Sequence, residues 1–358
     1  MAISILNWNG WRDTIECLEC VRGLDYPNYL TIVVDNGSSD DSVPRIREWA
    51  SGNLGHPHVL VDYTRSDALA GGCEGQEAVM ELTAPESKLV LIRNEENLGF
   101  TGGNNVAIHY ALQRKPSADY LFFLNNDAKV APDCLTHLVR TDQNDNLGVV
   151  GATIFDEAGE RVIAGPLTLP HFPLGRDPLA RWAPPSSQST SDFVESFAVH
   201  ASAALMRSEA LRAVRRSRGE YLEERLFMYY DELILAYAVR KAGFRCVVAM
   251  RARARHKNAQ SSGGLCNPVL YYYTVRNRLL VAREILPNPW KLTFHLLHVP
   301  LALAQAAKNL LHGRSHSWWA IMCGLVDGYR GVGGKWKHHD QEALGRKDVP
   351  LSRGAFCP

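Results

Sequence analysis

The 358-residue sequence contains no run of 18 consecutive apolar residues, so it predicts no standard transmembrane helix. Its first residues, Met1–Asn7, have neither the basic segment nor the cleavage site of a secretory signal peptide. Neither sign of charge dominates, because 39 Lys and Arg residues stand against 38 Asp and Glu residues. This balance argues against a protein that binds nucleic acid over its whole surface.

Cysteines with metal-binding spacing are also scarce. Among eight cysteines only Cys17 and Cys20 are spaced like zinc ligands, and no second pair completes a zinc site. In a chain of this size without an export signal, this usage favours reduced thiols in the cytoplasm.

Apolar residues make up 46% and charged residues 22%, which is typical of a globular protein.

Apolar runs alternate with polar loops and helical patterns over the first 130 residues. Strands are predicted near residues 3–8, 30–34, 88–92 and 120–124, and helices near 13–23, 43–50 and 104–113. This alternation predicts a mostly parallel sheet with helices on both faces. Further along, we expect irregular loops around a small helix in 51–87, a structureless proline-rich segment in 166–185, a strand in 193–203, and helices near 208–216 and 231–242.

Polar residues follow three of the predicted strands, as Asn7–Asn9, Asp35–Ser38 and Asn125–Asp127. Turn formation explains any one such cluster. Three clusters at the carboxyl ends of parallel strands favour a ligand site, because these ends meet at one edge of the sheet. The third cluster has the carboxylate and amide oxygens that suit Mg²⁺ together with a diphosphate.

Three other segments could carry chemistry. Asn97–Asn105 is rich in Gly and Asn and lacks the Walker lysine, so it is either a phosphate-binding loop before a helix or a glycine-rich turn. Asp231 and Glu232 follow an aromatic run, where they either cap a helix or supply a general base. His256 lies at the end of the basic stretch 240–257, just before the polar loop 258–264, and from there it could reach a diphosphate or a metal.

Taken in this order, the motifs resemble the family 2 glycosyltransferases, inverting nucleotide-sugar enzymes with the GT-A fold, and most closely their bacterial rhamnosyltransferase-like branch. Tyr271–Arg278 and Asp327–Gly331 resemble the same branch. The resemblance implies an α/β protein with a mostly parallel mixed sheet flanked by helices. Its catalytic domain would span 1–265, with a nucleotide-sugar-binding half at 1–130 and an acceptor and base half at 131–265, followed by a helical extension at 266–358.

The resemblance also implies roles for single residues. Asp35 and Asn36 would contact the nucleoside, and the nucleotide-sugar site would also include Asn7, Trp8, Asn9, Gly99, Gly103, Asn104 and Asn126. Asp127 would be the direct ligand of Mg²⁺ or Mn²⁺, helped by Asn125 and His256. Glu232 falls where the family has its catalytic base, but the acidic pair is Asp-Glu here instead of Glu-Asp, so Asp231 remains an alternative base.

The C-terminal part has its own composition. Residues 289–339 hold six Lys and Arg residues against one acid, with tryptophans at 290, 318, 319 and 336. Such a segment either lies on the inner face of the cell membrane or forms a helical lid on the catalytic domain.

These inferences predict an enzyme that moves a sugar from a nucleotide-diphosphate donor to a hydroxyl of a glycan or lipid-linked acceptor, for cell-surface polysaccharide. The resemblance suggests rhamnose on a dTDP carrier; the oligomeric state is left open. A sugar nucleotidyltransferase is one alternative, although Asn7–Arg12 lacks the basic glycine-rich loop of that class. A catalytically degenerate sugar-binding homologue is another, because Asn36 and Asn125 replace acids.

Overall fold

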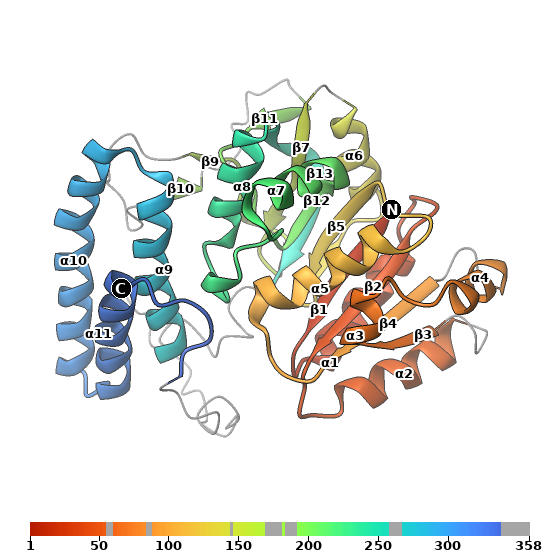
Figure 1. Ribbon diagram of the computed structural model, residues 1–358, viewed down its shortest axis with the longest axis horizontal. Coiled ribbons are helices and arrows are strands. Elements are labelled where there is room, and N and C mark those ends of the chain that lie inside the picture. The colour runs from red at the N-terminus through yellow and green to blue at the C-terminus, as the bar shows by residue number, and fades with distance from the viewer. Residues whose placement is uncertain are drawn as a thin grey trace.

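The computed structural model describes residues 1–54, 60–83, 88–143, 146–168, 181–182, 192–257 and 267–337. A central sheet is flanked by helices on both faces, and a group of three long C-terminal helices lies beside it (Figure 1). This is the expected α/β arrangement with a C-terminal helical extension.

The first half of the sheet is parallel, as predicted. Its strands are β1 (Ala2–Asn7), β2 (Leu30–Asn36), β3 (Leu60–Thr64), β4 (Lys88–Asn94) and β5 (Tyr120–Asn125), in the spatial order β5-β1-β2-β4-β3. The connecting helices are α1 (Trp11–Arg22), α2 (Ser42–Asn53), α3 (Arg65–Leu69), α4 (Glu74–Thr83) and α5 (Gly99–Gln113). The pairing sets Asn7 opposite Asp35 and Leu6 opposite Asn125, so three polar strand ends lie at one edge.

The second half continues the same sheet. Strand β12 (Ala203–Arg207) runs antiparallel between β5 and β7 (Leu147–Phe155), and β13 (Arg245–His256) and β11 (Phe193–Glu195) follow outward. The short strands β6 (Ala128–Val130) and β8 (Val162–Ala164) pair with β13 and β7. The helices of this half are α6 (Cys134–Asp142), α7 (Ser208–Arg218), η2 (Glu224–Leu226) and α8 (Asp231–Lys241).

Two apolar layers cover the two faces of the sheet. In β2, Ile32 and Val34 face one layer and Val33 faces the other, and all three side chains are fully buried. A strand buried on both faces has a continuous apolar sequence, which is why 30–34 carries no polar alternation. The apolar core therefore lies next to the polar strand ends of β1, β2 and β5 and holds them in place.

Three local predictions were wrong. Residues 60–83 form β3, α3 and α4 instead of loops around one helix. Of the predicted strand 193–203, only β11 and the first residue of β12 are strand, because the chain turns after β11, where Ser196 Oγ hydrogen-bonds to the backbone of Leu167 and Ala198. In the proline-rich segment, β9 (Leu167–Thr168) pairs with β10 (Arg181–Trp182), and residues 169–180 and 183–191 lie outside the described residues.

The C-terminal group consists of α9 (Pro268–Ile285), α10 (Asn288–Leu311) and α11 (Ser315–Arg330). Asn267 caps α9 by accepting a hydrogen bond from Val269 N, and Pro268 occupies the first helical position, a typical helix start. α9 packs against α8 and η2, and α10 is the outermost helix (Figure 1). In the part of the chain that the structure describes, no helix has the length and hydropathy needed to cross a membrane.

Candidate active site

The first two polar clusters are joined by hydrogen bonds. Asn7 Nδ2 donates to Asp35 Oδ1 at 2.7 Å and to Ser38 Oγ at 3.2 Å. Asp35 Oδ2 accepts from the backbone N–H of Ser38. Asn9 Oδ1 accepts from the N–H groups of Ser39 and Asp40, at 2.8 and 3.2 Å. The ends of β1 and β2 therefore form one polar surface.

Thr14 joins the third cluster to the first. Its hydroxyl donates to Asn7 Oδ1 at 2.8 Å and accepts from Asn126 Nδ2 at 3.1 Å. Thr14 could not be selected from the sequence, because a threonine in the first turn of a helix is usually explained by local capping. Its role is apparent only when β1 and β5 are neighbours.

Asn36 positions the loop after β4. Its Nδ2 donates to Asn97 Oδ1 and to the Gly99 carbonyl, and its Oδ1 accepts from Asn94 Nδ2 and Leu98 N, at 3.0–3.2 Å. Both donor hydrogens and both acceptor positions are thus occupied within the chain. Direct contact with a nucleoside stays a prediction for Asn36, and any such contact has to replace one of these bonds.

The Gly/Asn segment is mostly helix, so its prediction as a loop before a helix at Asn104 was wrong. Helix α5 begins at Gly99, which has a φ of +75°. A Cβ on Gly99 would lie 2.4 Å from the Phe227 carbonyl, and one on Gly103 would lie 2.4 Å from Leu6 Cδ1. These glycines permit close packing of α5 on β1 and on the segment before α8. Asn104 Oδ1 accepts from Ser4 Oγ. Contact of this segment with phosphate stays a prediction.

The predicted metal ligands lie together. The antiparallel pairing of β6 with β13 sets His256 opposite Ala128, beside Asp127. His256 Nε2 lies 3.0 Å from Asp127 Oδ1 and 3.2 Å from the Asn125 amide nitrogen. Asp127 and His256 are 7% exposed, and His256 Nδ1 has no hydrogen-bond partner among the described residues.

This donor set fits a hard divalent cation. A carboxylate oxygen and an imidazole nitrogen converge on one point beside an amide, and Mg²⁺ or Mn²⁺ takes its remaining ligands from phosphate oxygens and water. No cluster of three or more His, Cys, Asp or Glu side chains that could hold an ion occurs among the described residues. The protein would thus supply two strong ligands and depend on the nucleotide for others.

His200 is a further residue that sequence reasoning missed. Its ring lies 5.6 Å from the His256 ring, edge to face, and its Nδ1 lies 2.8 Å from Ser202 Oγ. Burial, and then the proximity of His256, lower the pKa of His200 to about 4, so the ring is neutral at physiological pH. A lone histidine before a strand carries no sequence signal.

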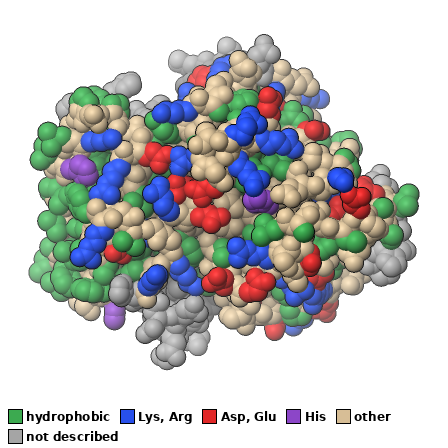
Figure 2. Space-filling model, viewed as in Figure 1, with side chains coloured by type: hydrophobic (Ala, Val, Ile, Leu, Met, Phe, Trp, Pro, Cys, Tyr) green, Lys and Arg blue, Asp and Glu red, His purple; other side chains and the backbone are tan. Residues whose placement is uncertain are grey.

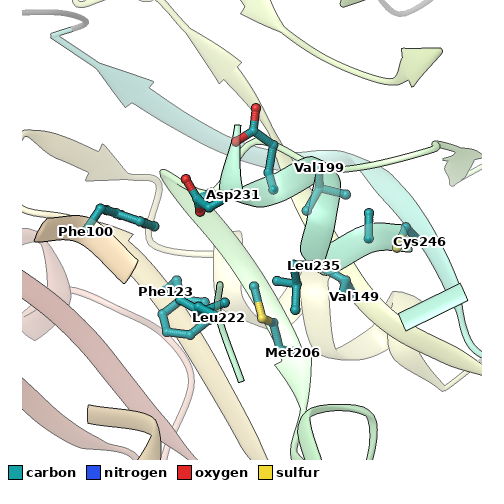
Figure 3. A pocket seen from close by; sticks show the side chains of 12 residues that line it. Phe100, Phe123, Val149, Val199, Met206, Leu222, Asp231, Leu235 and Cys246 are labelled. Carbon is teal, nitrogen blue, oxygen red and sulfur yellow. The ribbon is translucent and has the colours of Figure 1, made fainter. Parts of the chain in front are cut away.

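Asp231 and Glu232 line a small, largely apolar pocket at the start of α8. Figure 3 shows the Asp231 carboxyl group turned toward Phe100, above the side chains of Phe123 and Leu222. Asp231 is 6% exposed, and burial raises its pKa to about 7. Glu232 is half-buried.

The segment before β12 connects this pocket to the predicted metal ligands. Val199 and Ala201 line the pocket, His200 contacts His256, and the Ser202 carbonyl accepts from Asn125 N at 3.0 Å. Asp127 itself is not among the residues that line the pocket. Residues 199–202 therefore lie between the pocket and the group formed by Asn125, Asp127 and His256.

The backbone before α8 is unusual, because Phe227, Tyr229 and Tyr230 all have φ between 64° and 67°. Non-glycine residues rarely adopt this conformation, so other contacts must hold it. Asn277 Nδ2 contacts the carbonyls of residues 226, 228 and 229 at 2.7–3.0 Å. Arg276 is completely buried and uses all five N–H donors, on Asn277 Oδ1, the Tyr272 hydroxyl and the carbonyls of Arg225, Leu226 and Gly334. Helix α9 thereby positions Asp231 and Glu232.

The raised pKa of Asp231 predicts a pH dependence of stability. Between about pH 4 and pH 7 the unfolded chain has lost this proton while the folded protein keeps it, so stability falls as the pH rises. Each unit of difference between the folded and unfolded pKa changes the free energy of unfolding by about 1.4 kcal/mol. We expect Asp231→Asn to flatten the unfolding free energy across this window in urea titrations, with Glu209→Gln on α7 as an exposed control. Equal pH slopes for the parent and Asp231→Asn would contradict this prediction.

Comparison with known proteins agrees with this arrangement. Residues 75–215 match the model of Glycosyl transferase family 2, a stretch that includes α5 and Asn125–Asp127. The low-salt glycan biosynthesis hexosyltransferase Agl10 of Haloferax volcanii is 23% identical over 256 residues, covering 72% of this chain and 76% of that protein.

Solved structures share the architecture at low sequence identity. The mannosyltransferase PcManGT from Pyrobaculum calidifontis, in complex with GDP-Man and Mn²⁺, superposes with a TM-score of 0.51 at 14% identity, covering 92% of this chain and 86% of that chain. Residues 1–349 of S. aureus TarS in complex with UDP-GlcNAc give 0.53 at 13% identity, covering 92% and 81%. The chain has the GT-A fold, and the matches support a family 2 glycosyltransferase.

Proposed function

We propose that this protein is an inverting glycosyltransferase that moves a sugar from a nucleotide-diphosphate donor to a hydroxyl of a glycan or lipid-linked acceptor. One observation carries the proposal: Asn7, Asp35, Asn126 and Asp127 gather at the carboxyl ends of β1, β2 and β5, next to a pocket that contains Asp231 and Glu232. A polar donor site and an adjacent carboxyl-lined pocket are what sugar transfer to a hydroxyl requires.

On the donor side, Asp35 and its partner Asn7 would bind the nucleoside. Asp35 is 2% exposed and is oriented by two hydrogen bonds, so it presents its carboxylate without reorganisation. Trp8 and Asn9 are half-buried beside it and would complete this subsite. The donors bound to the solved neighbours, GDP-Man and UDP-GlcNAc, support a nucleotide sugar as the ligand.

Asp127 and His256, with Asn125, would hold Mg²⁺ or Mn²⁺. The Mn²⁺ in the PcManGT complex supports the use of a divalent ion. When bound, such an ion neutralises the charge that develops on the leaving diphosphate.

Glu232 would act as the base. It removes the proton of the acceptor hydroxyl while that oxygen forms a bond to the anomeric carbon, and the diphosphate leaves from the opposite face with the electrons of the broken bond. Glu232 is half-buried at the pocket, whereas Asp231 is buried and keeps its proton up to about pH 7. We therefore prefer Glu232, with Asp231 as its buried neighbour.

The name of the relative Agl10 supports a hexose, and the resemblance to the rhamnosyltransferase-like branch makes dTDP-rhamnose the first donor to test. The division into a catalytic domain at 1–265 and an extension at 266–358 also remains a proposal.

A thermal-shift screen of nucleotide diphosphates and sugar nucleotides, with and without Mn²⁺, tests the donor site. A ligand at 100 times its Kd stabilises a protein by about 2.7 kcal/mol, which raises the melting temperature measurably. We expect Mn²⁺ to enlarge the nucleotide-induced rise in the melting temperature of the parent. Asp127→Ala should lose this additional rise. Asp133→Ala, an exposed carboxylate before α6, is the matched control. The proposal would be overturned if no nucleotide changes the melting temperature. If Mn²⁺ still adds to the change in Asp127→Ala, the ion binds at another site.

A further inference from the structure

Helix α10 has an apolar outer surface. Its large exposed side chains are Leu292, Leu296, Leu301, Leu303, Leu310 and Leu311, with exposed fractions of 44–86%. In Figure 2, hydrophobic side chains gather along the left edge of the molecule, where Figure 1 places α10. Single exposed leucines are ordinary on protein surfaces, but a row along one helix marks an interaction surface.

The inner surface of α10 already supplies the core contacts. Phe294, His298, Ala302, Ala306 and Asn309 are buried, at the three- and four-residue spacing of a single helix face. The outward leucines are thus not needed to pack α10 on α9 and α11. A helix that is apolar on both faces is typical of one covered on both sides.

The charge around this surface is one-sided. No Asp or Glu occurs between Glu284 and Asp327, although acids and bases are balanced in the whole chain. The same stretch contains Lys291, Lys308 and Arg314. The stretch that carries this surface therefore has positive and no negative charge, and its three basic side chains are partly exposed.

Amphipathic aromatic side chains border the apolar row. Trp290, Trp319 and Tyr329 are 38%, 53% and 45% exposed. The Tyr329 hydroxyl lies 3.0 Å from His295 Nδ1, and Arg283 donates to the Tyr329 carbonyl at 2.7 Å. Trp and Tyr with an apolar body and a polar end are typical of the boundary between lipid tails and water.

We propose that the outer surface of α10, with the exposed edge of α11, lies on an anionic lipid bilayer. Leucine side chains would enter the boundary between headgroups and acyl chains, and the basic residues would face anionic headgroups. A second copy of this chain is a poorer occupant, because a two-fold contact would bring the same acid-free basic surface against itself. The inference does not depend on the proposed transferase activity, since none of these residues contacts the candidate active site.

Flotation of the full-length protein with vesicles tests this proposal. We expect binding to phosphatidylcholine vesicles that contain phosphatidylglycerol, and weaker binding to phosphatidylcholine alone or at high salt. The double variant Leu296→Glu and Leu303→Glu should reduce the bound fraction by about tenfold or more. Val79→Glu with Leu82→Glu on α4 is the matched control, because these side chains are also exposed, at 43% and 84%.

Two outcomes would overturn the proposal. One is that the parent does not float with anionic vesicles, and the other is that both double variants float equally well. Sedimentation velocity of the same proteins tests whether a second copy of the chain covers this surface instead. That alternative would be correct if the parent is a dimer that does not bind vesicles and the Leu296→Glu and Leu303→Glu variant is a monomer. A cooperative thermal unfolding transition like that of the parent verifies the fold of the Leu296→Glu and Leu303→Glu variant independently.

Discussion

Replacing Glu232 with Gln is expected to lower the turnover of sugar transfer by about 10²–10⁴-fold while donor binding is unchanged. Glutamine keeps the shape and most hydrogen bonds of the side chain but cannot accept the proton of the attacking hydroxyl at neutral pH. The loss should therefore appear in kcat, with little change in the KM for the donor. Initial rates with a sugar nucleotide identified by thermal shift measure both.

Asp231→Asn distinguishes the two carboxyl groups. If Glu232 is the base, Asp231→Asn keeps substantial turnover, because it removes a buried neighbour and leaves the accessible carboxylate at the pocket. Glu209→Gln, an exposed substitution on α7, should match the parent. A Glu232→Gln enzyme with parental turnover beside an inactive Asp231→Asn enzyme would transfer the role of base to Asp231.

Arg276→Lys is expected to destabilise the protein by about 3 kcal/mol, although the charge is retained. Lysine has three donors on one atom and cannot reach the separate acceptors that the guanidinium serves, so buried carbonyls of the segment before α8 lose their partners. Urea unfolding measures this loss. Arg283→Lys on the exposed face of the same helix should cost less than about 0.5 kcal/mol.

The same variant has a second readout in the folded enzyme. Because Arg276 and Asn277 hold a segment with three positive φ angles, its relaxation would displace Glu232 and lower kcat more than it raises the donor KM. Equal stability of Arg276→Lys and Arg283→Lys, with unchanged kcat, would contradict this positioning role.

Four of the five strands in the parallel half, all except β3, and the convergence of their ends were predictable from local sequence. Continuous apolar runs such as 30–34 identify buried strands, and the direction of a parallel sheet then brings residues 7, 35 and 127 to one edge. The roles assigned to these residues stay predictions, because they rest on the family resemblance.

The features that were missed depend on distant partners. Gly99 and Gly103 are poor helix formers, yet they lie in α5 because their lack of a side chain admits Phe227 and Leu6, which overrides propensity. Asn36 and Thr14 acquire their roles from neighbours far along the chain. Arg276 also acquires its role from distant residues. The sequence selects the stretch around it only through the family resemblance, because its carbonyl partners are about 50 residues away.

The reversed strand β12 has a consequence for motion during turnover. Its hydrogen bonds to β5 on one side and β7 on the other join the parallel half of the sheet to its second half, so that the sheet is continuous. Rotation of one half against the other would break this ladder, so hinge closure of the kind seen in two-lobed enzymes is not available here. In the proposed sugar transfer, water would therefore have to be excluded from the reacting sugar without rotation of the two halves of the sheet.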